Sequence, residues 1–202
     1  MSARSHSSDG RAIPFVAGAV AGIVTWLLGY AFTYVIVAPD VRESGLHRAV
    51  EAFDGEPATY EMVGWVFYNA HFVDTVFRNV PLVGSITTTY VGGEEGFTLL
   101  LHAVPAGLLF VAGLALATYR GVASVSDGAL AGLATVPGYL LLSAAGAFLF
   151  EVTVGGASGA PDAVPAVVLA GLVFPAIFAG GGGAVAAVTA DRDRRVSEEA
   201  RS

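Results

Sequence analysis

Four long stretches of the chain contain no Asp, Glu, Lys or Arg, namely residues 12–39, 96–119, 128–150 and 163–190. The hydrocarbon core of a bilayer is about 30 Å thick and is crossed by roughly 20 helical residues. Each stretch is therefore long enough to span a membrane, even when its helix is tilted. The pattern predicts an all-α integral membrane protein with four transmembrane helices, at about residues 13–37, 97–118, 128–150 and 164–189.

The segment between the first two spans, residues 40–95, is too long for a simple connection. From Thr59 to Asn79 apolar residues recur every three or four positions, and aromatic residues are frequent. This pattern favours an amphipathic helix at the lipid headgroup boundary. Residues 82–91 include Ile86 and three threonines and look extended. We therefore expect an extracellular amphipathic helix between helices 1 and 2, lying over the outer face of the bundle.

The arginines predict the orientation of the spans. The chain has ten basic residues and no Lys, and only three of its arginines fall in residues 40–95. Basic residues concentrate on the cytoplasmic side of membrane proteins, which predicts a multi-pass protein of the cell membrane with both termini in the cytoplasm. The cytoplasmic tails are then residues 1–11 and 191–202, and the membrane domain is residues 12–190.

Composition excludes several classes of function. The chain has no Cys, which rules out disulfides, iron–sulfur clusters and Cys-based zinc sites. No nucleotide-binding glycine loop or hydrolase motif is present, and nothing is basic enough for nucleic acid. We therefore expect no enzyme activity, no cofactor and no nucleic-acid partner. Absent Lys and a net charge of −7 resemble the composition of proteins from extremely halophilic archaea.

Four residues form a candidate polar cluster: His71, Asp74, His102 and Glu151. His102 is the only ionisable residue other than tyrosine inside any predicted span, and such residues mark functional sites in membranes. If the four side chains converge under the external helix, they would suit proton coupling or a His/carboxylate metal site. The alternative is that they stay separate, with an Asp74–Arg78 pair, a surface His71, a His102 bonded to a backbone carbonyl and Glu151 in water.

Several prolines and glycines lie inside the predicted spans. Pro105, Pro137 and Pro175 each lie inside one of the last three spans, where they would act either as hinges or as static bends. Gly18 and Gly22 have GxxxG spacing in the first span. Such small residues form either a dimerisation face or ordinary packing contacts within one chain.

The run Gly180–Gly183 in the fourth span is a further sign of close packing. Each glycine in a helix costs about 1 kcal/mol relative to alanine, so the run needs a compensating contact. We expect it to pack tightly against the first span.

The stretch Gly64-Trp65-Val66-Phe67-Tyr68-Asn69-Ala70-His71-Phe72-Val73, between a long first span and a proline-containing second span, resembles small uncharacterised membrane proteins of haloarchaea. Some of those proteins are labelled transporter-like, without an assigned substrate. The resemblance implies a source and a compartment, and no mechanism.

Together these patterns favour a small transporter or channel-like protein. Four spans are too few to enclose a large path, so transport also predicts a homo-oligomer. The alternative is a non-transporting assembly or accessory subunit, which would bind a membrane-protein partner through its external helix. Under either interpretation, transporter or accessory subunit, the protein is embedded in the lipid bilayer.

Overall fold

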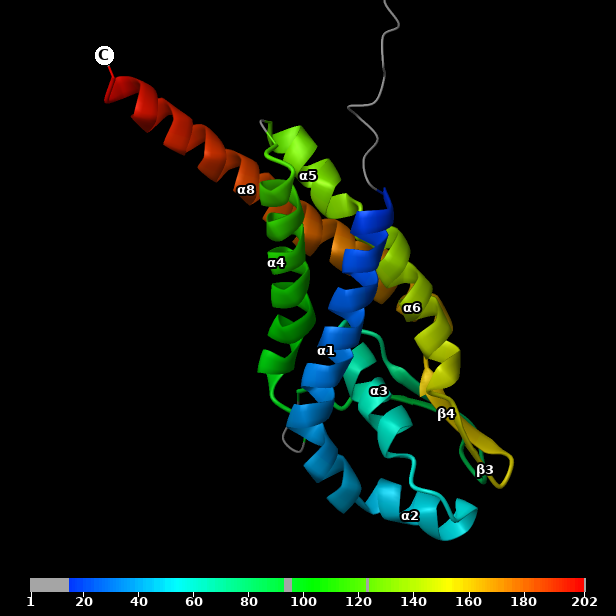
Figure 1. Ribbon diagram of the computed structural model, residues 1–202. Coiled ribbons are helices and arrows are strands. Elements are labelled where there is room, and N and C mark those ends of the chain that lie inside the picture. Colours follow the sequence, from blue (N-terminus) through cyan, green and yellow to red (C-terminus); the bar gives the residue numbers. More distant parts are fainter. Residues whose placement is uncertain (1–14, 93–95, 123, 202) are drawn as a thin grey trace, which may run out of the picture.

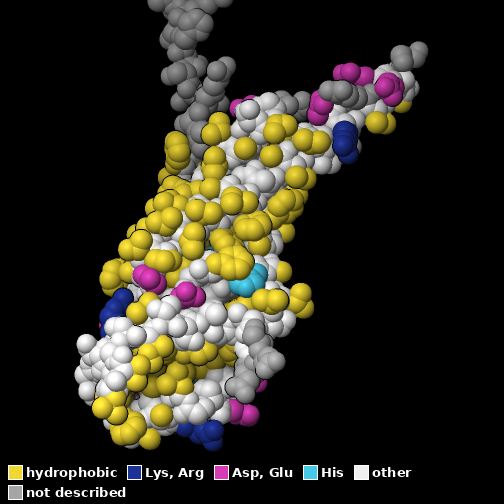
Figure 2. Space-filling model, turned by 180° about the vertical axis from the view of Figure 1, so that it is seen from behind, with side chains coloured by type: hydrophobic (Ala, Val, Ile, Leu, Met, Phe, Trp, Pro, Cys, Tyr) yellow, Lys and Arg dark blue, Asp and Glu magenta, His cyan; other side chains and the backbone are white. Residues whose placement is uncertain are grey.

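The computed structural model describes residues 15–92, 96–122 and 124–201, so the predicted tail 1–11 lies outside the described residues. Four helical segments are long and apolar enough to cross a membrane, as the charge-free stretches predict (Figure 1). Seen from behind, the surface over the bundle is apolar and the charged side chains gather at its two ends (Figure 2). The segments are α1 (Phe15–Glu43), η1 with α4 (Leu99–His102, Ala103–Tyr119), α5 with α6 (Val125–Leu133, Val136–Leu149), and α7, η2 and α8 (Ala163–Pro165, Ala166–Val173, Phe174–Glu199).

The fold is not all-α, because a four-stranded antiparallel sheet lies at one end of the bundle. The strand order is β2-β1-β4-β3, so the loop after the first span and the loop after the third span share one sheet. In the central strand, Thr75 is paired with Thr88 on one side and with Pro161 on the other. The strands are β1 (Thr75–Val80), β2 (Gly84–Thr88), β3 (Val152–Val154) and β4 (Ala157–Pro161).

The helix predicted through Asn79 is wrong in its second half. Helix α3 (Thr59–Asn69) ends in a tight turn in which Phe72 has a φ of 60°, and the chain then becomes β1. Residues 75–80 include Val76, Phe77 and Val80, which suit a strand as well as a helix. Pairing with strands on both sides decides the conformation, and β4 lies too far along the chain for local periodicity to reveal it.

Helix α3 is also buried, where a surface helix was expected. Its residues Met62 to Asn69 are all buried, including Tyr68 with its hydroxyl group. The C-terminal end of α3 enters the bundle, where the Phe67 ring meets the edge of the Trp26 ring at 5.1 Å and the Tyr68 hydroxyl donates to the Ser143 carbonyl. We call α2 (Gly45–Asp54), α3 and the sheet the cap.

The run Gly180–Gly183 packs against α4 and α5, so the expected contact with the first span is wrong. A Cβ on Gly182 would lie 2.9 Å from the carbonyl carbon of Phe110 in α4. A Cβ on Gly183 would lie 2.8 Å from the carbonyl carbon of Gly128 in α5. The absence of side chains therefore lets α8 cross two helices at backbone contact. Beyond this crossing α8 runs on as a helix to Glu199, through most of the predicted tail (Figure 1).

Each of the three span prolines stands beside an irregular turn. Pro105 lies in the first turn of α4, after the 3₁₀ turn η1, and Pro137 follows the break between α5 and α6. Pro175 follows η2, a π-helix, in which each amide bonds to the carbonyl five residues earlier instead of four. A proline has no amide hydrogen to donate, which accounts for irregular bonding nearby. Hinge motion at these three places stays a prediction.

Candidate functional site

The structure brings His71 and His102 of the predicted polar cluster close enough for their charges to interact. His71 is fully buried and His102 is half-buried, whereas Asp74 and Glu151 are exposed. Within the part of the chain that the structure describes, no three His, Asp or Glu side chains lie close enough to hold a metal ion. The metal-site interpretation of these residues stays a prediction.

His71 joins α3 to α6. Its Nδ1 lies 2.8 Å from the Phe67 carbonyl oxygen, so this nitrogen must carry the proton and donate it. Nε2 is then the acceptor, and the Tyr139 hydroxyl donates to it at 2.7 Å. Burial lowers the pKa of His71 to about 4, so the ring is neutral at neutral pH. Both ring nitrogens are occupied by protein, which gives His71 a structural role.

His102 follows the separate arrangement that the sequence left open. Its Nδ1 lies 2.9 Å from the Ala70 carbonyl oxygen, to which it donates. Its ring stacks on Phe72 with the ring centroids 4.1 Å apart. These contacts fasten the start of α4 to the turn that follows α3.

Asp74 and Arg78 do not lie in a helix, so the predicted spacing of one helical turn between them is absent. Arg78 lies in β1 and Asp74 directly before it, and both are exposed. The backbone of Asp74 accepts a hydrogen bond from the Asp162 amide at 2.9 Å, which closes the sheet beside β4. Glu151 begins the segment after α6, next to Phe150, whose carbonyl accepts a hydrogen bond from the indole of Trp65.

Gly18 and Gly22 are packing positions within one chain. A Cβ on Gly18 would overlap Ala134, and a Cβ on Gly22 would overlap the Thr135 carbonyl, at the break between α5 and α6. On the other side, a Cβ on Gly138 would lie 2.7 Å from the carbonyl carbon of Ala19. The GxxxG face is thus covered by the same chain.

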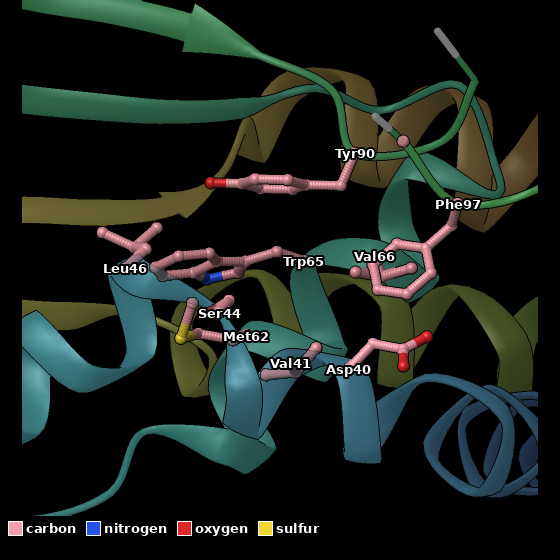
Figure 3. Close-up of a pocket in the computed structure, with 10 residues that line it drawn as sticks. Asp40, Val41, Ser44, Leu46, Met62, Trp65, Val66, Tyr90 and Phe97 are labelled. Carbon is pink, nitrogen blue, oxygen red and sulfur yellow. The ribbon is translucent and has the colours of Figure 1, made fainter. Parts of the chain in front are cut away.

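The cap contains two adjoining cavities that the sequence analysis missed. One, of about 360 Å³, lies between the end of α1, α2, α3 and the segment before η1 (Figure 3). The other, of about 470 Å³, lies between α2, α3 and the sheet. Leu46, Trp65 and Tyr90 line both, so the two spaces meet at these side chains. Figure 2 shows a hollow with apolar walls at this end of the molecule.

Aromatic side chains hold the wall of the cavities rigid. The Trp65 and Tyr90 rings are nearly parallel, with centroids 6.4 Å apart, and Phe77 meets Trp65 edge-on at 5.4 Å. Asn69 fixes the segment that carries Tyr90, because its Oδ1 accepts from the Tyr90 amide at 2.7 Å. Burial raises the pKa of the Tyr90 hydroxyl to about 12, so it stays protonated.

The walls are almost free of charge. Of the described residues that line the two cavities, only Asp40 is charged. The sequence held one signal for this site, since Leu46, Val50 and Phe53 recur at helical spacing in α2 and line the second cavity. A third cavity, of about 250 Å³, lies between α4 and α8 toward the opposite end of the bundle.

Comparison with known proteins leaves the chemistry of this site open. No curated protein and no solved structure matches the chain. One family matches residues 1–190, which is most of the chain, and it is described as a family of unknown function (DUF7978). The chain belongs to this family.

Proposed function

We propose that the protein binds one long apolar chain, of a lipid or a similar amphiphile, in the two cavities of its cap. The observation that carries the proposal is the pair of adjoining, apolar cavities of about 360 and 470 Å³, which share three lining residues. Sites for small molecules are typically concave, mostly apolar and about 300–1,000 Å³ in volume. The shape and the lining both suit a hydrocarbon chain.

The cap gives a physical reason to expect an occupant. Protein interiors are close-packed, and large apolar voids lose the contacts that stabilise the surrounding side chains. Here Phe53 is 83% exposed and Ile86 40% exposed, although both line the second cavity. A bound hydrocarbon chain would cover these side chains and gain roughly 25 cal/mol for each Å² of apolar surface buried.

The proposal places the cap outside the cell and both termini in the cytoplasm. Support comes from the arginines, since seven of the ten lie on the side of the termini. Binding at the cap is compatible with the accessory-subunit prediction. At the level of α3 the bundle is filled by Trp26, Phe67 and Tyr139. This packing gives no support to transport, which stays a prediction.

Ligand titration with a matched pair of variants tests the proposal. The purified full-length protein would be titrated with a fluorescent polyene fatty acid, and its bound lipids would be extracted and identified by mass spectrometry. Leu46 lines both cavities, so Leu46→Trp fills the space where they meet. Leu82 is fully exposed at the β1–β2 turn and lines neither cavity, so Leu82→Trp is the control.

We expect saturable binding of one fatty acid per chain. If Leu46→Trp displaces about two methylene groups, affinity falls by roughly tenfold, and Leu82→Trp leaves it unchanged. Absence of saturable binding, or equal affinity in the two variants, would overturn the proposal.

A further inference from the structure

We propose that the ligand is a lipid of the surrounding bilayer, whose chain enters the first cavity sideways between the end of α1 and the start of η1 while its head group stays beside Asp40. This inference rests on the proposed function and adds the source of the ligand, its route and its head-group class.

The first cavity opens at the ends of two membrane spans. Asp40 and Val41 line it from the last turn of α1. Gly96 and Phe97 line it from the residues just before η1, which leads directly into α4. The mouth therefore lies where these two spans leave the apolar part of the membrane.

Apolar surface continues from the spans to this mouth. Ile36 lies one helical turn before Asp40 on the same face of α1 and is 48% exposed. On the other side, Leu99 and Leu100 follow Phe97 closely and are 66% and 75% exposed. A hydrocarbon chain moving from the bilayer into the cavity would keep apolar contacts along this route, and would avoid the cost of crossing water.

The route continues inward without a polar barrier. Trp65 and Tyr90, which both line the first cavity, line the second one as well, and none of the described residues that line the second is charged. Figure 3 shows the Tyr90 ring above the Trp65 ring, with Phe97 and Asp40 at the other side of the pocket. A chain that enters past Phe97 would therefore reach the sheet after passing Trp65.

Asp40 defines the head group. Among the residues that the structure describes, it is the only charged one that lines either cavity, and it is exposed. A carboxylate at the mouth attracts an ammonium head group and repels one with a net negative charge. We therefore expect zwitterionic lipids with an outer ammonium to be preferred over anionic lipids, by roughly twofold to fivefold, the range of an exposed ion pair.

Quenching of tryptophan fluorescence by brominated lipids tests the route. The chain has two tryptophans, and Trp26→Phe leaves only Trp65, at 1% exposure, to report on the cavities. Trp26 is a suitable position to change, because its buried Nε1 has no hydrogen-bond partner that a Phe would lose. Trp65→Phe gives the matched control, in which the remaining indole lies in the bundle.

The Trp26→Phe protein would be reconstituted in phosphatidylcholine vesicles whose lipid chains carry bromine. We expect strong quenching of Trp65, weaker quenching in the Trp65→Phe control, and recovery of Trp65 emission when an unbrominated fatty acid competes for the cavity. Quenching by a brominated fatty acid in detergent, but not by the bilayer lipid, would overturn lateral entry and leave the proposed function standing. Quenching by neither would overturn both.

Head-group selection is tested by replacing brominated phosphatidylcholine with brominated phosphatidylglycerol. We expect weaker quenching with the anionic lipid, loss of this difference in Asp40→Asn, and no loss in Glu43→Gln. Glu43 is an exposed acid at the same helix end that lines neither cavity. Equal quenching by both lipids in the unchanged protein, or equal effects of the two substitutions, would overturn the role of Asp40.

Discussion

Alanine substitutions along the Gly180–Gly183 run test the helix crossing one residue at a time. A Cβ on Gly181 would have nothing within 4 Å, whereas a Cβ on Gly183 would overlap the Gly128 carbonyl and lie 2.8 Å from its carbon. The two glycines are two residues apart in one helix, so the intrinsic gain in helix propensity is the same, about 1 kcal/mol. The only large difference between the two substitutions is the space available.

The overlap at Gly183 involves backbone, which cannot rotate away as a side chain can. Overpacking typically costs about 1–3 kcal/mol, and the upper half of this range is expected here. Gly183→Ala should then destabilise the protein by about 1–2 kcal/mol, while Gly181→Ala should leave stability unchanged or raise it by up to about 1 kcal/mol. At about 2–4 °C per kcal/mol, the two variants should differ in Tm by roughly 2–12 °C.

Thermal unfolding of the two purified variants in the same detergent, followed by loss of the monodisperse peak in size-exclusion chromatography, measures this difference. Gly182→Ala should behave like Gly183→Ala, because its Cβ would meet the backbone of α4 at Phe110. Equal Tm values for the variants at positions 181 and 183 would refute the argument that α8 crosses α5 at backbone contact.

Two further predictions concern the packing of α1 and the buried histidine. Gly22→Ala should lower the Tm through overlap with Thr135, without changing the oligomeric state, whereas Gly107→Ala, with nothing within 4 Å, should change neither; a changed mass in light scattering for Gly22→Ala alone would contradict packing within one chain. His71 has a pKa of about 4 when folded and an ordinary value of 6.5, so the unfolded chain binds more protons between these values. The contribution of His71 to the free energy of unfolding should therefore be constant above pH 6.5 and fall by up to about 1.4 kcal/mol per pH unit toward pH 4. His71→Gln should lack this part of the slope, and identical pH profiles of the two proteins would contradict it.

The spans were predictable because a bilayer imposes one strict requirement, a run of about 20 residues without charge. The cap was harder, because its structure depends on pairing between distant segments. In the sheet, residues 75–78 pair with residues 158–161. A local sequence pattern cannot predict a pairing partner so far along the chain. The β3–β4 hairpin did carry a local signal, since Gly155 and Gly156 both have positive φ, as a two-residue hairpin turn requires.

The candidate site was predictable only in part, because the sequence shows which residues can do chemistry and not which spaces are empty. His71 and His102 are candidates from the sequence, and in the structure both make hydrogen bonds that hold the end of α3 in place. The second cavity lies between an apolar face of α2 and the sheet. The sequence patterns did not predict that sheet, so they could not predict the space beside it. Trp65 was assigned to a membrane-surface helix, when it forms the wall between the two spaces.

The burial of α3 within the bundle sets an order for assembly of the chain. Tyr68 donates its hydrogen bond to Ser143, 75 residues further on, and His71 accepts one from Tyr139. At a synthesis rate of about 5–20 residues per second, α3 is made roughly 4–15 s before these partners exist. During that interval α3 can pack on α1, as Phe67 does on Trp26, but it cannot yet make its contacts with α6. The first loop can therefore be completed only after the third span has been made.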